Sequence, residues 1–181
     1  MNHIDLDCVS FAVIDTETSG LTRDDVVIQC AIGFYDSDGN SLSIYNKYWQ
    51  LPSGLLINSR AQEVHQISPE DLETKGVSAH TELCALNTVL KNLKTHAIPI
   101  VAHNAKFDSR MLRQTATIHG VIDWHLQHED FFCTMTSAKS HVGALDRSGK
   151  LKAPSNSECY KFLFDVDAST VGPLHDANTC V

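Results

Sequence analysis

The chain has 181 residues, a length that fits one domain with a core of ordinary size, so we expect a single domain over residues 1–181. Hydrophobic residues make up 43% of the sequence and charged residues 20%, which excludes a disordered or fibrous protein. The net charge of −8 argues against a broad basic face that binds nucleic acid. It does not exclude a nucleic-acid enzyme, because divalent cations can supply positive charge inside an acidic cleft.

The six cysteines occur singly, with no CxxC pair. This is typical of reduced thiols and not of a disulfide framework or a zinc finger. The longest apolar runs, such as "IPIVA" at residues 98–102, are too short to span a bilayer, and the N-terminal residues do not resemble a signal peptide. We therefore expect a cytoplasmic protein with no membrane contact.

Three strands are predicted in the first third of the chain. "SFAVIDTETSG" is typical of an apolar strand that breaks at Gly20, and "VVIQCAIGFYD" and "SLSIYNKYWQL" predict two further strands joined by "DSDGN". The join also resembles the start of a calcium-binding loop, but the rest of that motif is missing. Asp-Gly between two apolar strands predicts a hairpin turn instead.

Helices alternate with strands in the remaining chain. From Ala79, apolar residues recur at three- and four-residue spacing and predict a helix. These residues are Leu83, Leu86, Val89, Leu90 and Leu93. "IPIVAHN" then predicts a buried strand, and "AKFDSRMLRQTATIHG" a helix with Asn104 as N-cap and with Phe107 and Met111 on its inner face.

A short strand is predicted at "FFCTM", followed by helices at "TSAKSHVGAL" and "SNSECYKFLF". Three early strands followed by alternating helices and strands predict an α/β fold, with a mixed sheet flanked by helices.

Asp15 and Glu17 lie in "VIDTETSG", where residues two apart on a strand point to the same side. Their Cα atoms would be about 7 Å apart, which makes a bay for a hard cation. The alternative is an exposed strand end with two solvated acids. Because Val13 and Ile14 lead directly into the pair, we expect the carboxylates at the end of a buried strand, where open α/β sheets bind ligands.

Asp108 lies in "AHNAKFD", in the first helical turn after a predicted strand. There the helix macrodipole favours an anion, and the side chain can face the end of the sheet. We expect the three carboxylates to converge, and oxygen ligands of this kind suit Mg²⁺ or Mn²⁺.

The segments "DTETSGL", "HNAKFD" and "HDA" resemble, in this order across nearly the whole chain, the three motifs of the DnaQ-like (DEDDh) 3′→5′ exonucleases. This is the class of the proofreading subunit of bacterial DNA polymerase III. "EVHQIS" resembles a further family segment between the first and second motifs. The resemblance implies an RNase H-like fold and the removal of nucleotides from the 3′ ends of single-stranded nucleic acid. We expect the substrate to be DNA in preference to RNA. The resemblance also allows a DNA polymerase as partner.

The resemblance implies roles for individual residues. Asp15 would bridge two divalent ions, Glu17 would join it on one ion, and Asp108 would hold the other. His175 would be the general base, a role that suits a histidine because its unperturbed pKa lies near the working pH. A further set would lie along the substrate: Thr18, Gly20, Leu21, His65, His103, Asn104 and Phe107. Without the resemblance, His65 is an ordinary loop histidine.

The terminal motif "LHDANTCV" departs from the family pattern. The family has a fourth aspartate five residues after the histidine, and counting from His175 reaches Cys180. Asp176 is no straightforward substitute, because it lies about 40° around a helix and about 6 Å along its axis from position 180. A thiolate is a poor ligand for Mg²⁺ and a better one for Mn²⁺ or Zn²⁺. We also expect a shortened terminal helix.

Two weaker signals carry no assigned site. His125 and His128 in "WHLQH" lack a third metal ligand at matching spacing, so we expect them at a surface or turn. The loop "ALDRSGKLKAPS" is basic and either is solvated or lines a path for phosphates.

Two functions are compatible with these patterns. The first is a 3′→5′ exonuclease that depends on Mg²⁺ or Mn²⁺, with two ions in an intact site. The second is a catalytically impaired protein of the same fold that binds nucleic-acid ends or a polymerase partner, which Cys180 favours.

Overall fold

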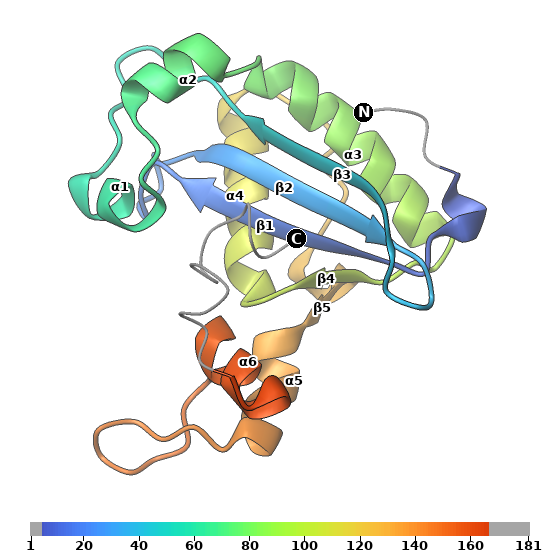
Figure 1. Ribbon diagram of the computed structural model, residues 1–181. Helices are drawn as coiled ribbons and strands as arrows, with labels where there is room; N and C mark the ends of the chain where they lie inside the picture. Colours follow the sequence, from blue (N-terminus) through green and yellow to red (C-terminus); the bar gives the residue numbers. More distant parts are fainter. Residues whose placement is uncertain (1–4, 167–181) are drawn as a thin grey trace.

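The computed structural model describes residues 5–166, and its centre is a five-stranded sheet in the order β3-β2-β1-β4-β5 (Figure 1). The strands are β1 (Phe11–Thr18), β2 (Val27–Tyr35), β3 (Ser41–Tyr48), β4 (Ile100–Ala102) and β5 (Phe131–Cys133). β1, β2 and β3 pair antiparallel, whereas β4 and β5 run parallel to β1. The predicted mixed sheet and the predicted β2–β3 hairpin are confirmed.

The described chain forms the helices α1 (Ser59–His65), α2 (Pro69–Lys75), α3 (Ala79–Thr95), α4 (Ala105–Ile118), α5 (Thr134–Val142) and α6 (Asn156–Phe164). It also forms the short 3₁₀ turns η1 (Leu6–Cys8) and η2 (His128–Asp130). The sequence predicts α3 to α6 but neither α1 nor α2. The expectation of a loop around His65 is therefore wrong, because this residue ends α1.

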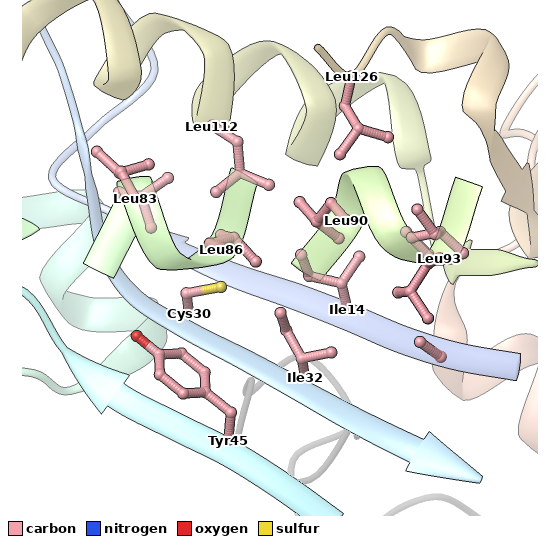
Figure 2. Close-up of a cluster of buried hydrophobic side chains, with 14 of the residues drawn as sticks. Ile14, Cys30, Ile32, Tyr45, Leu83, Leu86, Leu90, Leu93, Leu112 and Leu126 are labelled. Carbon is pink, nitrogen blue, oxygen red and sulfur yellow. The ribbon is translucent and has the colours of Figure 1, made fainter. Parts of the chain in front are cut away.

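The main core lies between one face of the sheet and the helices α3 and α4. Figure 2 shows leucines of α3 directed at Ile14 and Ile32 of the sheet, with Leu112 of α4 beside them. Four of the predicted residues on α3, Leu83, Leu86, Leu90 and Leu93, are fully buried, each worth about 1.5–3 kcal/mol relative to exposure. Val89 lies at the edge of this core and is only partly buried.

A shift in strand pairing divides the buried residues of β2 between two cores. Glu17 pairs with Gln29 and Thr18 pairs with Val27, so Ile28 has no Cα partner in β1. Val27 packs in the main core, and Ile28 packs in a second cluster with Ile67 and Leu72 beside α2. A bulge of this kind redirects side chains at the end of a strand, and here it lies beside the predicted carboxylates.

Helices α5 and α6 extend beyond the edge of the sheet, next to β5 (Figure 1). They contact each other, and neither of them has a fully buried residue. Within residues 5–166, no helix has the length and apolar character needed to cross a membrane.

Candidate active site

A cavity of about 590 Å³ opens at the C-terminal end of β1, between this strand, α1 and the start of α4. It brings together every predicted site residue that lies within residues 5–166. These residues are Asp15, Glu17, Thr18, Gly20, Leu21, His65, His103, Asn104, Phe107 and Asp108. His175 and Cys180 lie outside the described residues.

The sheet topology explains why this end of β1 can form a site. β1 is the central strand, with antiparallel β2 on one side and parallel β4 on the other. Its C-terminal end is therefore the point where the connections leave in different directions, which is where open α/β sheets bind ligands. Asp15 is half-buried and Glu17 is buried with 8% of its surface exposed, so the alternative of two solvated acids at an exposed strand end is wrong.

Asp108 is the most buried of the three carboxylates, with 1% of its surface exposed. It lies in the first turn of α4, and the Thr16 hydroxyl donates a hydrogen bond of 2.9 Å to its Oδ1. Burial, followed by the negative charges of Asp15 and Glu17, holds the pKa of Asp108 well above its ordinary value. The dipole at a helix N-terminus contributes at most about 2 kcal/mol, so burial of the charge outweighs it.

The three carboxylates share one cavity without forming a complete ligand set on their own. Among residues 5–166, no group of three or more His, Cys, Asp or Glu side chains is arranged to hold a metal ion. The chemistry of the donors nevertheless fits a hard divalent cation, because carboxylate oxygens are its preferred ligands. A cation would also offset the repulsion between carboxylates that raises the pKa of Asp108.

His65 reaches the cavity from the last position of α1, where only 6% of its surface is exposed. The backbone N–H of Ile67 donates a hydrogen bond of 3.0 Å to Nδ1 of His65. Because Nδ1 accepts this bond, the imidazole is neutral and carries its proton on Nε2. His65 can therefore offer an N–H donor, but no basic nitrogen, on its Nε2 side.

Both ring nitrogens of His103 are used by the protein. Nε2 lies 3.1 Å from the carbonyl oxygen of Pro154, and Nδ1 lies 3.0 Å from the hydroxyl of Thr134. Burial lowers the pKa of His103, so the neutral ring donates from Nε2 to Pro154 and accepts from Thr134 at Nδ1. His103 thus ties the end of β4 to the start of α5 and to the segment before α6.

Asn104 and Phe107 follow on the same side of the cavity. Asn104 is the N-cap of α4, as predicted, but its side chain makes no capping hydrogen bond and its backbone is left-handed, with φ 65°. Asparagine tolerates this conformation better than most residues. The Phe107 ring packs partly against the main core, and the Arg110 guanidinium lies 5.6 Å from the ring centroid.

Residues that sequence reasoning missed also line the cavity, among them Thr16, Asn58, Arg60 and Asn156. Arg60 is the only lysine or arginine among the described residues that line it. It is exposed and follows Asn58, whose side chain caps α1 by accepting a hydrogen bond from the Arg60 backbone N–H. Asparagine is a preferred N-cap residue, but nothing local to Asn58 predicts that α1 folds toward β1.

The two histidines of "WHLQH" are exposed, His125 in an irregular segment and His128 in η2, which confirms their expected surface position.

Comparison with known proteins identifies the family and the fold of the chain. The sequence model of the RNase T exonuclease family matches residues 12–178. No curated protein sequence matches the chain significantly. Among solved structures, E. coli exonuclease I in complex with a dT13 oligonucleotide is 17% identical at a TM-score of 0.69, with 93% of this chain and 38% of that chain covered.

Two further exonuclease I structures are similar. A product-bound exonuclease I is 17% identical at a TM-score of 0.69, with 93% of this chain and 41% of that chain covered. A moderately thermophilic exonuclease I from Methylocaldum szegediense is 16% identical at a TM-score of 0.63, with 80% of this chain and 33% of that chain covered. At these identities the likeness concerns the fold, and this chain spans about two fifths or less of each relative. The chain belongs to the RNase T exonuclease family, among the DnaQ-like 3′→5′ exonucleases, and has their RNase H-like fold.

Proposed function

We propose that residues 1–181 act as one exonuclease domain that hydrolyses nucleotides from the 3′ ends of single-stranded DNA and depends on Mg²⁺ or Mn²⁺. The observation that carries the proposal is the shared cavity, in which Asp15, Glu17 and Asp108 lie at the end of the central strand. Family membership supports the reaction type. Exonuclease I structures with dT13 and dA16 oligonucleotides support single-stranded DNA as the substrate class.

The three carboxylates are the proposed ligands of two divalent ions. Asp15 would be shared by both ions, Glu17 would join it on one, and Asp108 would bind the other. The ions would supply an activated water and offset charge on the leaving 3′ oxygen. A bound cation would also favour the ionised form of Asp108, which burial and the neighbouring carboxylates disfavour in the protein alone.

The remaining proposed roles belong to other parts of the chain. His175, outside the described residues, would be the general base that removes a proton from the attacking water. Thr18, Gly20 and Leu21 would contact the terminal nucleotide from one side of the cavity, and Asn104 and Phe107 from the other. His65 would lie beside the substrate, while His103 would hold the wall of the cavity.

A second candidate function rests on Cys180. If the missing aspartate prevents metal binding, the chain would bind single-stranded 3′ ends without cleaving them. Tight binding of a labelled strand without turnover, in both Mg²⁺ and Mn²⁺, would support this alternative. A DNA polymerase partner and a cytoplasmic location stay predictions.

The primary test is cleavage of a 5′-labelled single-stranded oligonucleotide in Mn²⁺. A ladder that shortens from the 3′ end is the expected result, and Asp15→Asn should abolish it. Circular single-stranded DNA should stay intact, since an exonuclease needs an end. An RNA strand of the same sequence measures the sugar preference. Intact linear strands at high enzyme concentration would contradict the proposal.

A further inference from the structure

The loop between β1 and β2, residues 19–26, forms one rim of the cavity. Gly20, Leu21 and Thr22 line the cavity from this loop, and 71% of the Leu21 surface is exposed. A single exposed leucine is ordinary on a protein surface. What matters for the site is where the loop places these three residues, and this depends on how the loop is held.

Asp25 holds the loop from inside. It is buried, with 8% of its surface exposed, and it is not among the residues that line the cavity. Its Oδ1 accepts a hydrogen bond of 2.8 Å from the Ser19 hydroxyl. Its Oδ2 accepts two bonds of 2.7 Å, one from the backbone N–H and one from the hydroxyl of Thr22. Asp25 thus joins the first residue of the loop to its middle.

The carboxylate of Asp25 is kept ionised by these bonds. Burial alone would raise the pKa of Asp25, but the hydrogen bonds from Thr22 and Ser19 together outweigh burial and lower the pKa below its ordinary value. Hydrogen bonds to a charged acceptor are about twice as strong as those between neutral groups. The loop therefore surrounds a buried, ionised carboxylate, and this carboxylate is not one of the three that share the cavity.

Gly20 fits this arrangement because it has no side chain. A Cβ at this position would lie 2.6 Å from Oδ2 and 2.7 Å from Oδ1 of Asp25. The loop backbone and the carboxylate are thus packed too closely for any other residue. This contact gives a direct way to test whether Asp25 sets the position of Gly20.

Contacts to two neighbouring elements extend the effect of Asp25. The Gln114 side chain on α4 donates to the carbonyl oxygen of Thr22 at 2.9 Å and also to that of Asp25. On the other side, the backbone N–H of Asn58, the N-cap of α1, donates to the carbonyl oxygen of Ser19 at 2.7 Å. The loop is therefore fixed to both helices that face it across the cavity.

We propose that Asp25 is a positioning residue that holds Gly20, Leu21 and Thr22 in place for the terminal nucleotide of a single-stranded substrate. The inference rests on the proposed function. A loop that is already ordered does not lose conformational freedom when the substrate binds, so Asp25 lowers the KM and the Kd for the strand. It leaves kcat unchanged, because it acts on binding and not on the reacting groups.

The test compares Asp25→Asn with Asp24→Asn, which removes the same charge from an exposed neighbour. The amide NH₂ of the introduced asparagine cannot accept a hydrogen bond, so either Ser19 or Thr22 loses its partner. We expect KM for a 5′-labelled oligonucleotide to rise about fivefold to tenfold in Asp25→Asn, with kcat within about twofold of the wild type. Asp24→Asn should match the wild type. Equal KM in the two variants, or a fall in kcat alone, would overturn the proposal.

Two further measurements keep the test independent of stability and of cleavage. Fluorescence anisotropy in EDTA gives the Kd for the same strand. If the wild type does not cleave, a Kd ratio between Asp25→Asn and Asp24→Asn of about five or more still supports the positioning role. If Asp25→Asn does not fold, Thr22→Val removes one of the same bonds and should raise the Kd about twofold to threefold.

A double-mutant cycle tests the geometry itself. Gly20→Ala should weaken binding in the wild-type background, because the new methyl group collides with the Asp25 carboxylate. In the Asp25→Ala background the colliding atoms are absent, and the added methyl group should have no further effect on the Kd. Equal effects of Gly20→Ala in both backgrounds would contradict the assigned contact.

Discussion

The Thr16 hydroxyl donates a hydrogen bond of 2.9 Å to Oδ1 of Asp108, and this contact joins the central strand to the helix that carries the second motif. Both side chains are buried, Thr16 with 5% and Asp108 with 1% of their surface exposed. The bond partly offsets the burial and the charge repulsion that raise the pKa of Asp108. It also fixes the direction of the carboxylate relative to Asp15 and Glu17 on the same strand.

Thr16→Val tests this contact, because valine keeps the shape of threonine and removes the donor. We expect a loss of about 1–3 kcal/mol in the free energy of unfolding, measured by urea denaturation, since a buried acceptor loses its partner. Thr16→Ser retains the hydroxyl and should recover most of the loss. If Thr16→Val and Thr16→Ser have the same stability, the hydrogen bond is not what stabilises this pair.

Asp108→Asn should stabilise the protein in EDTA, increasingly so as the pH rises. The pKa of Asp108 is raised in the folded protein, so between its ordinary value and the raised value the folded state binds more protons than the unfolded state. The free energy of unfolding therefore falls as the pH rises through this window, and the asparagine variant lacks this loss. Urea titrations of the wild type and of Asp108→Asn at pH 4, 6 and 8 measure how the difference in the free energy of unfolding changes with pH.

The metal dependence of the same pair distinguishes the carboxylate's proposed role from simple burial. Mn²⁺ should raise the melting temperature of the wild type more than that of Asp108→Asn, because binding to the folded state stabilises it. An equal rise in both proteins would mean that Asp108 does not bind the ion.

The pH series in EDTA has its own contrary outcome. If the difference in the free energy of unfolding between the wild type and Asp108→Asn stays constant from pH 4 to pH 8, the pKa of Asp108 is not raised.

His103 gives a pH dependence of the opposite sign. Burial lowers its pKa below that of the unfolded chain, so in the window between the two values the unfolded state binds more protons. Its contribution to stability is therefore complete at pH 7.5 and is lost as the pH falls. We expect His103→Asn to be less stable than the wild type by about 1–2 kcal/mol at pH 7.5, from the loss of two hydrogen bonds.

The same comparison at pH 5 checks the sign. The difference in the free energy of unfolding between His103→Asn and the wild type should shrink at the lower pH. The other histidines are present in both proteins, so their contributions cancel. A difference that grows at pH 5 would show that protonated His103 is the stabilising form.

Much of the fold follows from local patterns. The alternation in β1 and the three- and four-residue spacing in α3 are strong signals, because each element buries one continuous apolar face. α1 and α2 were not predicted, since each has only seven residues and at most one buried side chain. α2 depends on a capping box between Ser68 and Asp71 and on packing of Leu72, and only the folded chain provides that packing surface.

Some residues of the candidate site could likewise be predicted from the sequence, and others could not. Asp15 and Glu17 could be identified from their spacing on one strand, and Asp108 from its place after another. Arg60 and Asp25 could not be identified, because no residue pattern in the sequence marks either of them. Arg60 reaches the cavity only because α1 folds toward the end of β1, and Asp25 acts through contacts with the loop around it.

Arg60→Gln should weaken binding of single-stranded DNA and reduce its dependence on salt. Arg60 is the only lysine or arginine of the described chain that lines the cavity, so it is the expected partner of a backbone phosphate. Each phosphate contact that is lost on a single strand should reduce the slope of log K against log salt by about 0.7. Anisotropy titrations between 50 and 200 mM NaCl, roughly the range over which such contacts weaken, measure the slope.

Two variants control the Arg60 prediction. Arg60→Lys keeps the charge but not the planar fork, and its affinity should lie between those of the wild type and Arg60→Gln. Lys91→Gln removes an exposed charge on α3 that does not line the cavity, and it should leave the slope unchanged. A similar slope for Arg60→Gln and Lys91→Gln would show that Arg60 does not contact a phosphate.

Cys180→Asp tests whether the missing carboxylate limits activity. In the proposed site it would restore a hard ligand to the ion that Asp15 and Glu17 share, and so raise Mg²⁺-dependent cleavage at least about tenfold, equivalent to about 1.4 kcal/mol in the barrier. Mn²⁺ tolerates a thiolate better, so the gain in Mn²⁺ should be smaller. Asp15→Ala in the same background should abolish the gain, because both ions lose their shared ligand. If Cys180→Asp changes nothing in either metal, the ligand at position 180 is not what limits cleavage. Equal, metal-independent rates in all these variants would rule out two-metal catalysis by this chain.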